Sequence, residues 1–89
     1  MRKGQSWFWI EVTDTFGGEA NYCWVNRYKV AAKSMRGAIV KVHNATGYNF
    51  RCTGDYGDMT RYDASNSCTC AFVEYLSDYH KEQKHTVLA

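Results

Sequence analysis

At 89 residues the chain has room for one small domain, residues 1–89, and no second core. Its 45% hydrophobic and 16% aromatic residues exclude a globally disordered chain, and its net charge of +2 is too small to assign a partner class. No apolar run approaches the ~20 residues that span a bilayer, and the first residues lack the cleavage site of a secretory signal. We therefore expect a cytoplasmic protein with no membrane partner.

The first predicted element is a strand over residues 6–14, SWFWIEVTD. Successive side chains of a strand point to opposite faces of its sheet. The row that belongs to the core is apolar: Phe8, Ile10 and Val12. The other row carries Trp7 and Trp9 where a soluble sheet would face water. We therefore expect two uncovered indole rings on an open face of the sheet.

A second strand is predicted over residues 21–30, after a hairpin turn at Gly17 and Gly18. Tyr22 and Trp24 alternate along it and are candidates to join the first two tryptophans on the open face. Register decides this placement, because a shift by one residue would move Trp24 to the opposite face.

A helix follows, with Ser34 as its N-cap and Gly47 at its left-handed end. Its buried stripe recurs at helical spacing: Met35, Ala38, Ile39 and Val42. Three further strands are predicted over residues 48–53, 59–63 and 68–75, and residues 77–89 form a short helix or a flexible tail. The expected fold is α+β, with about five strands in one antiparallel sheet (order β-β-α-β-β-β) and one helix on one face.

Charge is distributed unevenly, since residues 20–54 contain no acidic residue. A segment with one sign of charge favours an anionic partner, either nucleic acid or an acidic protein. A solvated face that keeps a small domain soluble is the alternative. We expect the partner-binding surface to combine aromatic and basic side chains: Trp7, Trp9, Tyr22, Trp24, Arg27, Lys29, Lys33, Arg36, Lys41 and Arg51.

Neither a metal nor a cofactor is expected. Cys68 and Cys70 form a C-x-C pair inside a predicted strand, whereas zinc ligands are usually spaced C-x2-C or wider on a turn. Together with Cys23 and Cys52 they are predicted to be free thiols. The three histidines are scattered and no nucleophile motif is present, so we expect a protein that is not an enzyme.

Two stretches of the chain carry a resemblance to known proteins. They read WFWIEVTDTFGGEANYCWVNRYKVAAKSMRGAIVKVHNATGYNFR and GDMTRYD. The chain resembles the small accessory proteins of phages and prophages of Gram-negative bacteria, and is similar in size and element order to several anti-CRISPR proteins. The resemblance implies a non-enzymatic inhibitor in the cytoplasm of a bacterial host cell. It would bind a CRISPR effector complex and block its action on target DNA, and the resemblance transfers no role to any single residue.

Three functional hypotheses follow. The first is an inhibitor or adaptor that binds a host protein or ribonucleoprotein complex through the open aromatic face. The second is a module that binds single-stranded nucleic acid, with bases stacked on the aromatic rings and phosphates held by the basic residues. The third is a homodimeric structural phage protein that buries the same face. All three depend on rings that the C-terminal tail does not cover.

Overall fold

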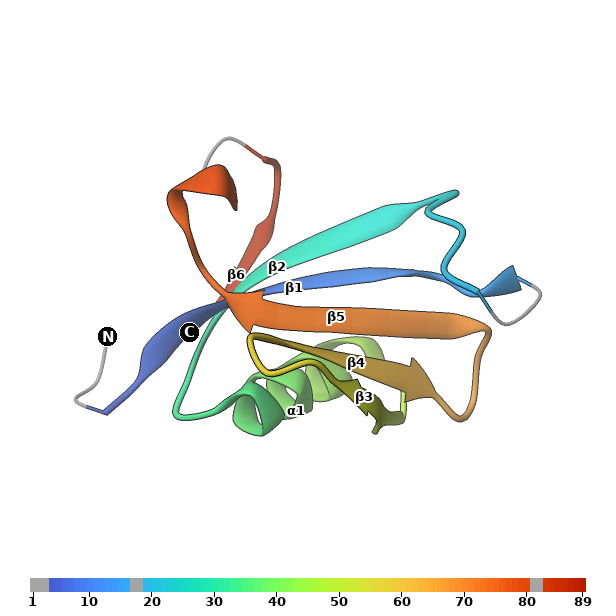
Figure 1. The fold of residues 1–89 in the computed structure, drawn as a ribbon, viewed down its shortest axis with the longest axis horizontal. Helices are drawn as coiled ribbons and strands as arrows, with labels where there is room; N and C mark the ends of the chain where they lie inside the picture. The colour runs from blue at the N-terminus through green and yellow to red at the C-terminus, as the bar shows by residue number, and fades with distance from the viewer. Residues whose placement is uncertain (1–3, 17–18, 81–82) are drawn as a thin grey trace.

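A six-stranded sheet and one helix make up the fold (Figure 1). The computed structural model describes residues 4–16, 19–80 and 83–89. Its elements in chain order are β1 (Ser6–Asp14), β2 (Val25–Ala32), α1 (Met35–Thr46), β3 (Phe50–Asp55), β4 (Met59–Ala64), β5 (Thr69–Tyr75), a 3-10 helix (Asp78–His80) and β6 (Thr86–Leu88). The α+β class, with one helix and a single sheet, is therefore confirmed.

The strands lie in the order β3-β4-β5-β1-β2-β6, which places β1 in the interior of the sheet. β1 pairs antiparallel with β2, from Ser6 opposite Ala32 to Thr13 opposite Val25. It also pairs antiparallel with β5, from Phe8 opposite Tyr75 to Asp14 opposite Thr69. The expected sheet of about five antiparallel strands needs a correction, because β6 adds a sixth strand that runs parallel to β2.

α1 begins and ends as its sequence predicts. The Ser34 hydroxyl accepts a hydrogen bond from the backbone N–H of Gly37 at 3.1 Å, which satisfies one free donor of the first turn. Gly47 ends the helix with φ +83°, a conformation that glycine adopts without strain. The side chains of Ala38, Ile39 and Val42 are buried against the sheet. One face of the sheet is thus covered by α1, and its core includes Phe8, Ile10 and Val12 as expected.

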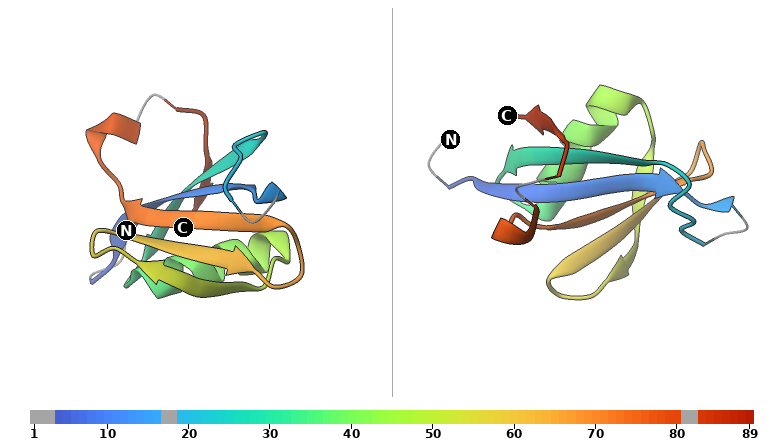
Figure 2. Two further views of the ribbon diagram at one scale, coloured as in Figure 1. Left: turned by 45° about the vertical axis from the view of Figure 1, so that its right-hand side comes forward. Right: turned by 90° about the horizontal axis from the view of Figure 1, so that it is seen from above.

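The C-terminal segment, residues 77–89, was expected as a short helix or a flexible tail. Its described parts, 77–80 and 83–89, form the 3-10 helix and β6. The segment lies above the sheet in Figure 1, on the side opposite α1, and Figure 2 shows β6 in red beside β2. Both faces of the sheet therefore carry a cover, one helical and one formed by the end of the chain.

The second strand begins later than the sequence predicted. β2 starts at Val25, so Tyr22 and Trp24 lie in the segment that connects it to β1. Tyr22 has φ +55°, which removes it from any regular strand. The turn predicted at Gly17 and Gly18 lies outside the described residues.

Candidate interaction surface

The open face is the face of the sheet turned away from α1. Trp7, Trp9, Glu11 and Thr13 of β1 lie on it, because Phe8, Ile10 and Val12 between them belong to the core on the opposite side. The expectation that both tryptophans share this face is thus met, but their exposure differs.

Trp9 is not an uncovered ring. Its side chain is 1% exposed, and its indole stacks on the imidazole of His80 with ring centroids 4.7 Å apart and an interplanar angle of 11°. His85 meets the same indole edge-on at 5.3 Å. Among the residues described, the Trp9 Nε1 has no hydrogen-bond partner. The prediction that Trp9 stands free for a partner is therefore wrong, because the C-terminal segment folds over it.

His80 holds this cover in place. Its Nε2 lies 2.6 Å from the Oε1 of Glu74 on β5, and its Nδ1 accepts a hydrogen bond from the backbone N–H of Ser77 at 3.1 Å. Because Nδ1 accepts, the proton of the neutral ring sits on Nε2 and is donated to Glu74. The 3-10 helix is thereby tied to β5 directly beside Trp9.

Trp7 is half-buried, and Lys29 of β2 extends over its ring with Nζ 4.6 Å from the centroid. A cation over an indole face is attracted by the negative face of the ring. Lys29, expected to meet a partner, is therefore already engaged within the sheet.

Charged side chains of both signs cross the middle of the open face. Arg27 donates from Nε to the Glu11 carboxylate at 2.9 Å, and Arg61 donates to the Asp63 carboxylate at 3.1 Å. The Arg61 guanidinium also lies 5.7 Å from the ring centroid of Phe72. Burial works to raise the pKa of Asp63, but hydrogen bonds from Arg61 and Thr53 outweigh it and leave that pKa below its ordinary value of 3.8. The open face therefore carries both positive and negative side chains, and Arg27 and Arg61 are each paired with a carboxylate.

The predicted basic residues do not gather on one platform. Arg27 and Lys29 lie on the open face, and Arg51 lies on the same face near the opposite edge of the sheet, where it pairs with Asp63 in the ladder. Lys33 follows β2, while Arg36 and Lys41 belong to α1 on the other side of the sheet. The Lys41 ammonium donates to the backbone carbonyl of Ala31. Arg27, Lys29 and Arg51, which were expected beside the aromatic rings, therefore share the open face, whereas the other three predicted partner-binding cations lie away from it.

Exposed aromatic side chains concentrate instead in the connection between β1 and β2. Phe16 is 82% exposed, Tyr22 53% and Trp24 39%. The Tyr22 ring stacks on Phe72 of β5, with centroids 6.3 Å apart and an interplanar angle of 14°. We call Phe16, Tyr22 and Trp24 the aromatic end. Two of its three members, Tyr22 and Trp24, were predicted as partner-binding residues.

Asp14 organises the aromatic end. Its backbone carbonyl accepts from the N–H of Asn21 at 3.0 Å, and its carboxylate accepts from the N–H of Cys23 at 2.9 Å. The side-chain amide of Asn21 donates to the carbonyl of Phe16, and the Thr13 hydroxyl donates to that of Trp24 at 2.8 Å. These bonds hold Tyr22 in its left-handed conformation, which an L-residue with a side chain adopts at a cost of about 1–2 kcal/mol.

Phe16 was missed from the sequence, although a signal was present. It is an apolar aromatic residue in TFGGEAN, a turn whose neighbours are small or polar. A large apolar side chain beside a double glycine has no core to enter, because a hairpin connection lies at the surface. The sequence could therefore have predicted an exposed side chain at Phe16.

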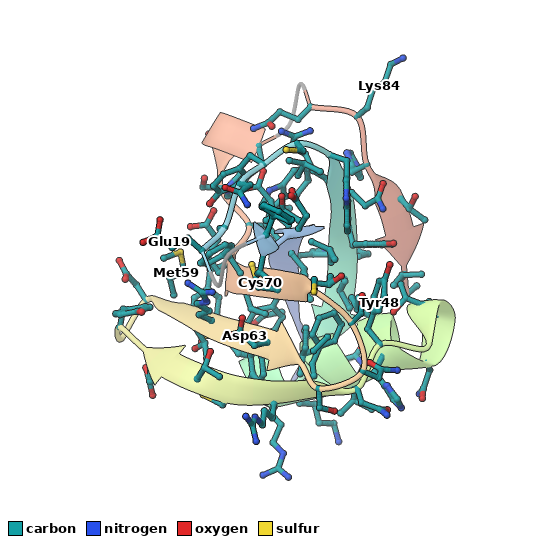
Figure 3. All side chains as sticks on the ribbon, turned by 90° about the vertical axis from the view of Figure 1, so that its right-hand side faces the viewer. Glu19, Tyr48, Met59, Asp63, Cys70 and Lys84 are labelled. Carbon is teal, nitrogen blue, oxygen red and sulfur yellow. The ribbon has the colours of Figure 1, made fainter. Side chains whose placement is uncertain are left out.

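Among residues 4–16, 19–80 and 83–89, no three or more histidine, cysteine, aspartate or glutamate side chains are grouped so that they could hold a metal ion. All four cysteines are free: Cys23, Cys52 and Cys68 are exposed, and Cys70 is buried. Burial raises the pKa of the Cys70 thiol, which keeps it protonated and unreactive at neutral pH. Figure 3 shows Cys70 and Asp63 on the adjacent strands β5 and β4, with Lys84 projecting from the C-terminal segment.

Within the described part of the chain, no helix is long and apolar enough to cross a membrane. Comparison with family models, with curated proteins and with solved structures finds no match for this chain.

Proposed function

We propose that this chain is a non-enzymatic binding module that docks on a protein or ribonucleoprotein partner through its aromatic end. The observation that carries the proposal is the exposure of Phe16, Tyr22 and Trp24 in one connection, whose described residues are hydrogen-bonded to Thr13 and Asp14 at the end of β1. Large aromatic side chains supply most of the energy of many interfaces, because they bury a wide apolar area with few rotatable bonds. Monomeric proteins seldom expose such side chains together without a use for them.

The aromatic end is also organised before any partner arrives. A residue in a strained backbone conformation persists only where its surroundings hold it, and such residues cluster at functional sites. Tyr22 fits this pattern, since hydrogen bonds to Asp14 flank it on both sides and its ring is stacked on Phe72. Less conformational entropy is then lost when a partner binds.

Charge balance favours a protein surface over nucleic acid. Binding to phosphates requires cations that are free to release counterions. On the open face Arg27 is bonded to Glu11, Arg61 to Asp63, and Lys29 lies over Trp7. A protein partner can bind a surface that carries charges of both signs. If the partner is a ribonucleoprotein, we therefore expect the contact to be made with its protein component.

The partner that the sequence resemblance implies is a CRISPR effector complex. The test is an assay of target-DNA cleavage and target-DNA binding by a panel of purified bacterial CRISPR effector complexes, with the protein added at increasing ratio. We expect inhibition that saturates at a fixed stoichiometry with one member of the panel. Failure with every member would remove this partner.

A variant pair tests the aromatic end itself, whichever partner is present. Phe16→Ser combined with Trp24→Ser removes two exposed rings, and Tyr56→Ser is the matched control, because Tyr56 is 61% exposed in the turn between β3 and β4. Affinity capture from a bacterial lysate, with and without nuclease, should recover a partner with the wild type and the control but not with the double variant. Equal recovery with all three would refute the aromatic end as the docking surface.

Light scattering separates a foreign partner from a second copy of the chain. We expect a constant monomer mass across the micromolar range for the wild type. A mass that rises with concentration, and that the double variant abolishes, would assign the aromatic end to a homodimer instead.

A further inference from the structure

β3 is the outermost strand on its side of the sheet, with β4 as its neighbour. The backbone N–H of Ser65 donates to the carbonyl of Asn49, so the backbone groups of Asn49 point toward β4. Backbone direction alternates along a strand of an antiparallel pair. The N–H and C=O groups of Phe50 and Cys52 therefore point outward, away from β4, where the described residues place no further strand.

α1 stands beside this edge, where the exposed Val40 and the half-buried His43 flank the core residue Ile39. Ile39, Val40 and His43 line one hollow of about 170 Å³ together with Asn49 and Phe50. Val40 is exposed although it is apolar, and the Nδ1 of His43 lies 2.6 Å from the carbonyl of Tyr48. Helix and strand edge thus form the two walls of a groove, which we call the α1–β3 groove.

Both walls come from the stretch of the chain that lacks acidic residues. α1 and the part of β3 up to Gly54 lie within residues 20–54. Arg36 lies on α1 close to Tyr62, where burial raises the pKa of the tyrosine and the Arg36 charge opposes that rise. Arg51 stands on β3 itself and is exposed. A strand laid along the groove would be flanked by one cation on each side.

The same edge is limited in length, which restricts what can bind. The ladder between β3 and β4 shifts between Cys52 and Gly54. Tyr56 packs over Gly54 so closely that a Cβ there would lie 2.7 Å from its hydroxyl. A bulge bends an edge strand away from continued pairing and protects it from indefinite association. The straight part of the edge suits a short segment rather than another sheet.

We propose that the α1–β3 groove binds an extended acidic segment of a partner protein, which adds to the sheet as a strand beside Phe50–Cys52. Main-chain hydrogen bonds to an exposed edge supply the affinity in this mode, and pockets for alternate side chains supply the specificity. Here the hollow between Val40 and Phe50 receives an apolar side chain. The exposed Arg36 of α1 and Arg51 of β3, which lie outside this hollow, receive carboxylates. The groove lies apart from the aromatic end and does not depend on it.

The test begins with two arrays of capped nine-residue peptides. In one array glutamates on both faces of the extended peptide surround a central valine, isoleucine, threonine or phenylalanine, because Arg36 and Arg51 lie on opposite faces of the sheet. In the other array lysine replaces glutamate. We expect binding from the acidic array alone. The best binder is then labelled for fluorescence anisotropy, and a version methylated at alternate backbone nitrogens, which cannot donate to the edge, should lose binding.

Charge variants assign the site. Arg36→Glu combined with Arg51→Glu should weaken the acidic peptide by about tenfold or more, because one favourable charge contact becomes repulsive on each side. Lys84→Glu combined with Lys33→Glu is the matched control, since it makes the same change of net charge at two exposed lysines outside the groove. Circular dichroism and urea titration establish that each variant is folded. Phe16→Ser with Trp24→Ser should leave peptide affinity unchanged.

Amide hydrogen exchange supplies a direct readout. In the free protein the outward N–H groups of Phe50 and Cys52 should exchange fast, and the bound peptide should protect both. The proposal is overturned by any of four results: no acidic peptide binds, the methylated peptide binds equally well, the two charge variants behave alike, or protection appears elsewhere. A dimer formed through β3 would also overturn it.

Discussion

Two aromatic regions of the molecule behave differently: Trp9 within β1, and the aromatic end in the connection that follows β1. In the first region, Trp9 is sealed beneath His80 and beside His85. In the other, Phe16, Tyr22 and Trp24 are exposed to different degrees, and the Tyr22 ring stacks on Phe72. The first region buries an indole as part of the structure, and the second presents rings to the surroundings.

This difference teaches that strand parity assigns a face but not exposure. Parity placed Trp7 and Trp9 on the correct side of the sheet. Exposure was then decided by the C-terminal segment, which lies far from β1 in sequence. In this protein the covering segment buries Trp9, one of the side chains that the sequence predicted to be exposed.

The largest expected difference between the two regions is in stability. Trp9→Ala should lower the free energy of unfolding by about 3–5 kcal/mol, because a fully buried aromatic ring leaves a cavity. Trp24→Ala, at a partly exposed ring, should cost less than about 1 kcal/mol. Urea denaturation followed by circular dichroism measures both, and similar losses for the two variants would erase the distinction.

His80 provides the next test, since it is the contact that covers Trp9. His80→Ala removes the stacked ring and the hydrogen bond to Glu74, and should destabilise the protein by about 1–3 kcal/mol. The tryptophan emission of the folded protein should also shift to longer wavelength as Trp9 meets water. His85→Ala, at an exposed edge contact, is the control and should change stability by only about 0.5 kcal/mol. An unshifted emission spectrum in His80→Ala would mean that another group excludes water from Trp9.

A smaller effect is expected at Tyr22, where stability and binding should separate. Tyr22→Gly relieves a left-handed conformation that costs about 1–2 kcal/mol and loses a ring stack worth about 0.5–1.5 kcal/mol. The net change in unfolding free energy should therefore lie close to zero, while partner capture falls. A large loss of stability would show that Tyr22 is structural, like Trp9.

The smallest effect is a pH response confined to the aromatic end. Desolvation works to raise the pKa of Asp14, but hydrogen bonds from Cys23 outweigh it and hold that pKa below its ordinary value of 3.8. A lowered carboxyl pKa stabilises the fold fully above the unfolded value, and this contribution disappears as the pH falls through the folded one. The amide resonance of Cys23 should therefore move only below about pH 4. Asp14→Asn should abolish that titration, and its persistence would assign it to another group.

Local elements were predictable from the sequence because local rules decide them. The hydroxyl of Ser34 and the glycine at 47 bound α1 as expected, and the apolar row of β1 entered the core. β3, β4 and β5 each appear within two residues of their predicted ranges at either end. Such features depend on capping, periodicity and turn chemistry within a few neighbouring residues.

The candidate surface was only partly predictable, because it depends on contacts between distant segments. The three-residue β6 pairs with β2 through Thr86–Leu88, and TVL alone gives too short a pattern to reveal a strand. The start of β2 was misplaced because Tyr22 and Trp24 have high strand propensity, whereas hydrogen bonds to Asp14 hold this part of the chain in a turn. Arg36 and Lys41 lie on α1 and Arg27 lies on β2, so they are on opposite sides of the sheet. The acid-free span had grouped all three by charge alone.

The interior position of β1 has a consequence for how the molecule is made. β1 can pair with β2 once the short connection between them has closed. Its pairing with β5, in which Phe8 lies opposite Tyr75, requires residues that are synthesised much later. Closing so long a loop is slow, and an unfinished strand edge can meet the wrong partner in the meantime. During synthesis on the ribosome, the nascent hairpin therefore carries an apolar row with one side open until β5 emerges.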